Sequence, residues 1–216
     1  MFLKYPERSA VKTRLASVLG KYLTHELYRC FLSDISTMTR QIKAQTIIVY
    51  SGPEGVSFSD FTGIQCFRQR GNNIGKRMHN AFTDVFARGF ERCVLIGSDS
   101  PDLPTVLVND SFDKLDVADV VIGPSVDGGY YLIGCKRQSL CPSIFHDIHW
   151  STANVFSETV KRIAESGLKF ARLPQWADID EFDDLKYFHE RNKDRSATSQ
   201  VMKFLITKGI INESKS

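Results

Sequence analysis

Cys93-Val94-Leu95-Ile96-Gly97 is the most strand-like run of the sequence, and Ser98-Asp99-Ser100-Pro101-Asp102-Leu103-Pro104 follows it directly. The short apolar run predicts a buried strand, and the polar run with two prolines predicts a loop at the carboxyl end of that strand. Ligands of open α/β sheets bind beyond the carboxyl ends of the strands. The segment therefore predicts an α/β fold with a functional site at an acidic loop.

Apolar runs and helical periodicity alternate on both sides of this segment, which is typical of a Rossmann-like α/β fold with a mostly parallel sheet. Further strands are expected at residues 1–4, 46–50, 64–68, 117–122, 131–135 and 169–173, and helices at residues 24–41, 74–88 and 151–166. Thr24 and Ser151 are suitable N-caps, and Gly89 and Gly167 suit the helix ends. Because no linker divides the chain, we expect one domain over residues 1–211 and a disordered tail over residues 212–216.

Composition limits the classes of function. The 216 residues are 42% hydrophobic and 25% charged, as in one globular domain, and the net charge of +3 is too small to predict nucleic-acid binding. Apolar runs are too short for a membrane span, and no secretory signal begins the sequence, so we expect a cytoplasmic protein. The five cysteines form no Cys-x-x-Cys pair, which favours reduced thiols over a disulfide framework.

Carboxylates in two loops are candidate ligands for Mg²⁺ or Mn²⁺. Asp99 and Asp102 offer hard oxygen atoms, although Asp99 could instead close a turn and Asp102 could cap a helix that starts near Thr105. Asp127 precedes Gly128 and Gly129, whose missing side chains would let a ligand approach the backbone, although a plain hairpin also explains this pattern. We expect this loop and the Asp99 loop to leave neighbouring strands, which favours function.

The acidic residues at 178–184 could complete such a site, and a solvated loop that leads into a helix is the alternative. His146 and His149 have a spacing that suits a metal, but no third ligand lies near them in sequence, which disfavours zinc. Basic residues surround the first strand-to-helix turn and a later glycine-containing loop, where they would hold phosphates or form a solvated surface. The first group is Lys4, Arg8, Lys12 and Arg14, and the second is Arg68, Arg70, Lys76 and Arg77.

Six ordered groups of residues carry a resemblance to a known family. They are Lys4-Tyr5-Pro6 with Val11-Lys12-Thr13-Arg14-Leu15-Ala16, Gly75-Lys76-Arg77-Met78, residues 97–104, residues 127–134, Trp150-Ser151-Thr152 and Asp178-Ile179-Asp180. Together they resemble the glycosyltransferase A (GT-A) superfamily, in its nucleotide-diphospho-sugar transferase branch of the selenodomain-associated type. That branch is similar to the guanylyltransferases that act on molybdenum cofactor and on 2-phospholactate.

The resemblance implies a GT-A fold, a mostly parallel, mixed central sheet with helices on both faces, and a divalent metal, Mg²⁺ or Mn²⁺. It implies that Asp99 binds the metal, that Asp180 or Asp178 completes the metal site, and that Lys12 and Arg14 meet phosphates. We expect catalytic roles for Asp127 and Asp180, although Asp127, Asp178 and Asp180 are all candidates for the general base. The further residues expected to bind nucleotide or phosphate are Lys4, Arg77, Ser98, Gly128 and Gly129. The partners would be a nucleotide or nucleotide-sugar and an unidentified small-molecule acceptor, and self-association into a homo-oligomer is left open.

Three functions fit this pattern. Glycosyl transfer from a nucleotide-sugar is favoured slightly, and a nucleotidyltransferase that releases pyrophosphate is the second. The third is a nucleotide-binding module with impaired catalysis, because the first loop reads Pro6-Glu7-Arg8-Ser9 where the family usually has Pro-x-Pro-Gly, and because the first strand is short.

Overall fold

The computed structural model describes residues 1–6 and 11–211. The tail expected at residues 212–216 and the Glu7-Arg8-Ser9 part of the first loop lie outside the described residues. No helix in the described part of the chain is long and apolar enough to cross a bilayer.

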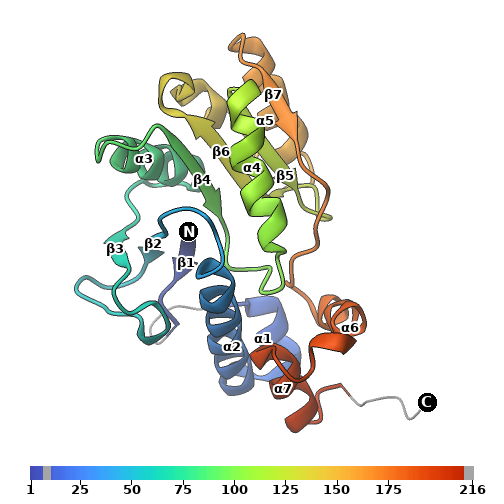
Figure 1. The fold of residues 1–216 in the computed structure, drawn as a ribbon. Coiled ribbons are helices and arrows are strands. Elements are labelled where there is room, and N and C mark those ends of the chain that lie inside the picture. Colours follow the sequence, from blue (N-terminus) through green and yellow to red (C-terminus); the bar gives the residue numbers. More distant parts are fainter. Residues whose placement is uncertain (7–10, 212–216) are drawn as a thin grey trace.

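The α/β fold with mixed, mostly parallel strand pairing is confirmed, and hydrogen bonds divide the strands into two sheets (Figure 1). The first sheet has the order β1-β2-β3 and is parallel. Its strands are β1 (Phe2–Lys4), β2 (Ile47–Ser51) and β3 (Gln65–Arg68). The second sheet has the order β4-β6-β5-β7, and β6 runs antiparallel to β4 and β5. Its strands are β4 (Arg92–Ile96), β5 (Val120–Pro124), β6 (Tyr130–Lys136) and β7 (Phe170–Arg172).

Helices cover both faces of these strands. They are α1 (Thr13–Leu19), α2 (Lys21–Thr39), α3 (Ile74–Phe86), α4 (Thr105–Val117), α5 (Val155–Glu165), α6 (Phe182–Arg191) and α7 (Gln200–Thr207). Short 3-10 turns lie at η2 (Ser59–Phe61), η3 (Arg137–Ser139), η4 (Pro142–Phe145) and η5 (Lys193–Arg195). In Figure 1, α4 crosses the second sheet on one side.

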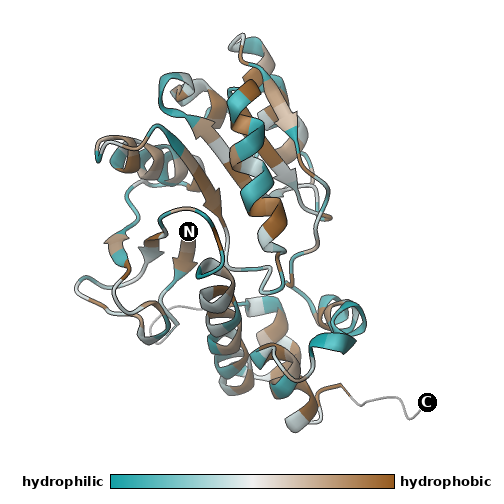
Figure 2. Ribbon diagram, in the orientation of Figure 1, coloured by the Kyte–Doolittle hydropathy of each residue, from teal (hydrophilic) through white to brown (hydrophobic). Residues whose placement is uncertain are grey.

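Two hydrophobic cores follow from the alternation of side chains along the strands. In β2, Ile48 and Tyr50 belong to the core beneath α2, α4, α6 and α7, whereas Ile47 and Val49 belong to the core beneath α3 and α5. Successive side chains of a strand point to opposite faces, so a strand that is apolar on both faces must be covered on both. In Figure 2, β4 is mostly hydrophobic, whereas α6 is mostly hydrophilic.

Three element boundaries differ from the sequence prediction by three residues or more. The helix expected to start after Thr24 begins at Lys21, because Gly20 takes a φ of 80° and turns the chain out of α1, while Thr24 is buried. Val117 ends α4 instead of starting a strand. Ser151 lies in a turn with a φ of 66°, and α5 begins only after Asn154.

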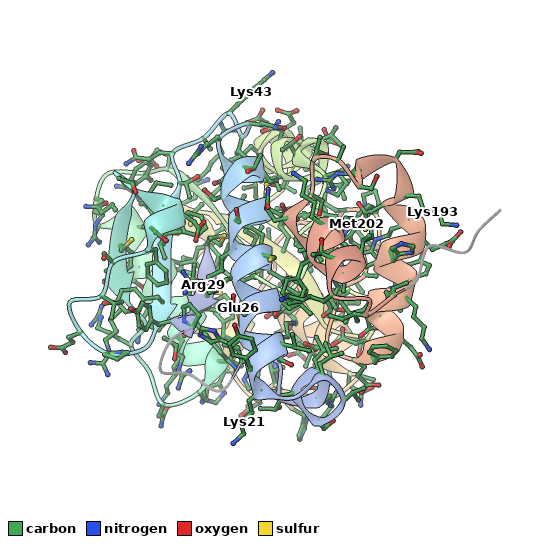
Figure 3. The ribbon with its side chains drawn as sticks, turned by 90° about the horizontal axis from the view of Figure 1, so that it is seen from below. Lys21, Glu26, Arg29, Lys43, Lys193 and Met202 are labelled. Carbon is green, nitrogen blue, oxygen red and sulfur yellow. The ribbon has the colours of Figure 1, made fainter. Side chains whose placement is uncertain are left out.

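Helix α7 is attached to α2 by a buried carboxylate. Asp34 of α2 accepts hydrogen bonds from the Ser199 hydroxyl (2.6 Å) and from the backbone amides of Gln200 (2.7 Å) and Val201 (3.1 Å). These amides belong to the first turn of α7, where backbone N–H groups have no partner within the helix. Figure 3 shows α2 and α7 side by side from below, with Met202 on α7, and Met202 is almost completely buried.

Candidate functional site

Three aspartates from two distant segments meet at one point. Asp127 lies in the hairpin between β5 and β6, and Asp178 and Asp180 lie in the loop before α6. One carboxylate oxygen of each lies within 4.8 Å of the others. Mg²⁺ and Mn²⁺ prefer clustered carboxylate oxygens, so the donor set fits the kind of ion that the sequence predicted.

The hairpin fixes Asp127 through its own backbone. The carboxylate accepts hydrogen bonds from the Ser125 hydroxyl and from the Gly129 amide, the latter at 2.9 Å. Gly128 has a φ of 89°, and a Cβ atom there would lie 2.2 Å from the carbonyl oxygen of Ala153. Only glycine therefore allows the hairpin to pack against the loop before α5.

Asp178 and Asp180 are held by the start of α6. The amides of Asp180 and Glu181 both donate to the Asp184 carboxylate, at 2.9 and 2.7 Å, and Glu181 and Asp184 form a capping box. The Ile179 amide donates to the Asp99 carbonyl at 2.9 Å, which ties this loop to the loop after β4. The acidic residues are therefore partly a helix start, as the alternative interpretation held, and partly members of the cluster.

Lys12 connects Asp99 to this cluster. Its ammonium nitrogen lies 2.5 Å from Asp99 Oδ1 and 2.8 Å from Asp180 Oδ1. The Lys12 side chain is only 5% exposed, whereas the two carboxylates are about half exposed. Burial alone would lower the pKa of Lys12, but the charges and hydrogen bonds of Asp99 and Asp180 outweigh burial, and its pKa is raised. Lys12 is therefore a charged group that contacts two carboxylates, one of which belongs to the three-aspartate cluster.

Asp178 has the most perturbed carboxyl group of the cluster. Burial, followed by the negative charges of Asp127, Asp180 and Asp99, raises the pKa of Asp178 to about 7. Such a shift at clustered carboxylates marks a place where a cation would relieve repulsion.

Asp102 has a structural role instead of a metal or capping role. Its buried carboxylate accepts two hydrogen bonds from Arg191, at 2.6 and 2.9 Å, and one from Asn192 at 2.7 Å. The residue before α4 is Pro104, and no side chain caps that helix. The expected N-cap at Asp102 is therefore wrong, because the aspartate bonds instead to the end of α6.

Ser98 and the backbone of Lys4 are connected through Tyr28. The buried Ser98 hydroxyl lies 3.0 Å from the Tyr28 hydroxyl, which also accepts from the Lys4 amide at 3.1 Å. Burial raises the pKa of Tyr28 to about 12, so its hydroxyl stays neutral and bridges β1 to the loop after β4. The Lys4 side chain itself is exposed.

Arg14 and Arg77 lie in different surroundings. Arg14 is 71% exposed and contacts Glu181, the residue after Asp180, at 3.2 Å. Arg77 donates from Nε to the Gly71 carbonyl at 3.1 Å, in the loop before α3. Arg14 thus borders the carboxylates, whereas the described contact of Arg77 is to its own loop.

His146 and His149 pair with different carboxylates. His149 Nδ1 lies 2.9 Å from Glu158, and His146 Nδ1 lies 3.0 Å from Asp147. Among the residues that the structure describes, the three aspartates form the one group of three or more metal-ligand side chains.

A cavity of about 680 Å³ lies elsewhere, between Arg29 and Leu32 of α2 and the segment 56–64, and none of its lining residues belongs to the aspartate cluster.

Two features of the site differ from or escaped the sequence prediction. The strands that precede the Asp99 and Asp127 loops are not neighbours, because β6 lies between β4 and β5. The hairpin that carries Asp127 leads into β6, which does pair with β4. The contact of Lys12 with two carboxylates has no local signal, since Asp180 is 168 positions away in sequence.

The structure resembles solved nucleotide-handling proteins. A protein from Desulfovibrio desulfuricans G20, provisionally described as a nucleotide-diphospho-sugar transferase, is 35% identical with a TM-score of 0.89, over 97% of this chain and 93% of that chain. CMP:2-keto-3-deoxy-manno-octonic acid synthetase complexed with CTP is 10% identical with a TM-score of 0.55, over 90% of this chain and 97% of that chain. The second likeness shows the fold alone.

A search of the curated proteins finds no match to this chain. A family model does match, over residues 34–152, which is more than half of the sequence and includes β4, the Asp99 loop and the Asp127 hairpin. The chain belongs to the family of that model, DUF2064, which is described as an uncharacterized protein conserved in bacteria.

Proposed function

We propose that this chain is a metal-dependent transferase that takes a nucleotide as its donor substrate. The observation that carries the proposal is the meeting of Asp127, Asp178 and Asp180 beside Asp99 and Lys12. A cation lowers the repulsion among carboxylates at this density, and Lys12 supplies a single positive charge. A divalent ion would provide further positive charge, and the nucleotide would provide a phosphate chain that Lys12 and Arg14 could bind.

The residues have separate roles in this proposal. Asp178 and Asp180, with Asp99 or Asp127, would hold Mg²⁺ or Mn²⁺, and the ion would supply charge to the departing phosphate oxygens. Lys12 and Arg14 would bind the phosphates, and Gly128 and Gly129 would leave room for the substrate beside Asp127. Asp127 would accept a proton from an acceptor hydroxyl, with Asp178 and Asp180 as the other candidates for this role.

We favour a nucleotide-sugar as the donor. The protein from Desulfovibrio desulfuricans G20 supports this choice. It is provisionally described as a nucleotide-diphospho-sugar transferase, and it is 35% identical over 97% of this chain. In glycosyl transfer, an acceptor hydroxyl loses its proton and bonds to the sugar carbon, the bond from that carbon to the phosphate oxygen breaks, and a nucleoside diphosphate leaves. In nucleotidyl transfer, the alternative, a phosphate oxygen of the substrate bonds to the α-phosphate of a nucleoside triphosphate, and pyrophosphate leaves.

Thermal-shift titration tests the nucleotide site first. Nucleoside diphosphates, triphosphates and their sugar derivatives would be added with Mn²⁺ and then with excess chelator, because a ligand that binds only the folded state raises the unfolding temperature. We expect stabilisation that needs both nucleotide and metal. Absence of stabilisation by every nucleotide tested would contradict the proposal.

Product analysis then separates the two reactions. The best-binding nucleotide would be incubated with pooled sugars, alcohols and phosphorylated metabolites, and the release of nucleoside diphosphate and pyrophosphate would be measured separately. Nucleoside diphosphate release that depends on an acceptor supports glycosyl transfer. Pyrophosphate release instead would replace the favoured donor with a nucleoside triphosphate.

A further inference from the structure

The Lys12 ammonium group lies between two carboxylates, and the Lys12 backbone has a strained conformation. The residue has φ and ψ of 47° and 53°, a left-handed conformation that is uncommon for a residue other than glycine. Such strain persists only where the surroundings fix the residue. Here the ammonium group contacts two carboxylates, and it lies 5.8 Å from the centre of the Phe31 ring.

The two halves of the site share one carboxylate. Asp180 belongs to the three-aspartate cluster and also bonds to Lys12 at 2.8 Å. A divalent ion at the cluster would therefore lie close to a buried ammonium group. Like charges at short range repel, so an ion at the cluster and the ammonium group of Lys12 would each weaken the binding of the other.

We propose that Lys12 is an internal competitor of the divalent metal, which keeps metal affinity low until an anionic phosphate chain draws the ammonium group away from Asp99 and Asp180. This inference rests on the metal site of the proposed function and adds a coupling to it. Metal and nucleotide would each bind weakly alone and tightly together, because each removes the obstacle that the other meets.

Replacement of Lys12 tests the competition without any nucleotide. Mn²⁺ alone would be titrated into the wild type, Lys12→Met and Arg14→Met, with free Mn²⁺ followed by electron paramagnetic resonance. We expect Lys12→Met to bind Mn²⁺ at least about tenfold more tightly than the wild type, a difference of about 1.4 kcal/mol. Arg14→Met is the matched control. It also removes one positive charge, but from a side chain that is 71% exposed and lies two positions further along the chain.

If Lys12→Met and Arg14→Met both bind Mn²⁺ more tightly by the same factor, the change in net charge explains the effect. That result would overturn the proposal. Unchanged or weaker binding by Lys12→Met would also overturn it. These results are independent of nucleotide transfer, which the product analysis addresses. Failure of transfer would leave the Mn²⁺ comparison intact, and failure of the competition would leave a metal-dependent nucleotide site intact.

A second measurement uses the wild type and does not depend on the folding of a variant. Acetic anhydride would label lysines with and without saturating Mn²⁺, and mass spectrometry would follow Lys12 and the exposed Lys186. Displacement of Lys12 by the metal should raise the rate of Lys12 labelling and leave Lys186 unchanged. Equal Lys12 labelling in both conditions, at saturating Mn²⁺, would show that metal and ammonium do not compete.

Discussion

Asp178→Asn should stabilise the metal-free protein at alkaline pH. The pKa of Asp178 is about 7 in the folded protein, against an ordinary value of 3.8, and burial is the main cause. The folded state therefore keeps a proton that the unfolded state loses, and this group makes the protein less stable as pH rises from 3.8 to about 7. This is the reverse of the usual behaviour of a paired aspartate.

The size of the effect follows from the shift. The difference between the two pKa values corresponds to a loss of about 4 kcal/mol in the free energy of unfolding above pH 7. Solvent in the partly open loop reduces this loss to about 2–4 kcal/mol. Asparagine carries no charge at any pH, so the variant should escape the whole penalty at about pH 8.5 and gain less than half as much at about pH 5.

Urea unfolding in chelator at the two pH values measures this gain, because the midpoint and slope give the free energy of unfolding. Asp183→Asn is the control. Its carboxylate is 87% exposed on α6 and contacts Lys186, so its effect should be small and nearly equal at both pH values. A gain for Asp178→Asn that is the same at about pH 5 and pH 8.5 would refute the electrostatic argument.

Three other substitutions test the fold and the site. Asp34→Ala should lower the free energy of unfolding by about 3–5 kcal/mol, since it leaves buried donors of α7 without a partner, and a loss below about 1 kcal/mol in urea unfolding would contradict this role. Gly128→Ala should cost about 2–4 kcal/mol because of its positive φ and its contact with Ala153, whereas Gly167→Ala, with a positive φ in open space, should cost about 1 kcal/mol. Equal losses in thermal unfolding would show that packing against Ala153 is unimportant. Asp99→Asn should weaken the Mn²⁺-dependent part of nucleotide binding by about tenfold or more, and identical responses of variant and wild type to chelator in a nucleotide titration would make Asp99 a turn residue only.

Much of the fold is encoded locally and was predicted from the sequence. The apolar runs at β2, β4 and β6 and the periodicity of α3 identify these elements within one or two residues at most of their boundaries. Gly89 has a φ of 98°, but α3 ends at Phe86 with Ala87 as its C-cap, so Gly89 lies in the turn after the helix. Gly167 follows the C-cap Ser166 of α5 with a φ of 70°, as its position predicted. Local patterns succeed here because burial on both faces requires continuous apolar strands and amphipathic helices.

The site was predicted only in outline, because its contacts are not local. The sequence indicated Asp99, Asp127, Asp178 and Asp180 as a group. In the structure, Asp127, Asp178 and Asp180 form one cluster, and Lys12 connects Asp180 to Asp99. It did not indicate that β6 separates β4 from β5, since strand order depends on how the whole chain packs. Asp102 shows the same limit, because an aspartate before a helix is also suited to a buried ion pair with a residue far along the chain.

The left-handed backbone at Lys12 places two opposing demands on one position. The conformation favours glycine or asparagine, whereas the contact with Asp99 and Asp180 needs an ammonium group. A lineage that no longer uses the site has no reason to keep lysine there, and it gains backbone stability by exchanging lysine for glycine or asparagine. Position 12 should therefore serve as a diagnostic position across relatives, in which glycine or asparagine identifies members that have abandoned the chemistry and kept the fold.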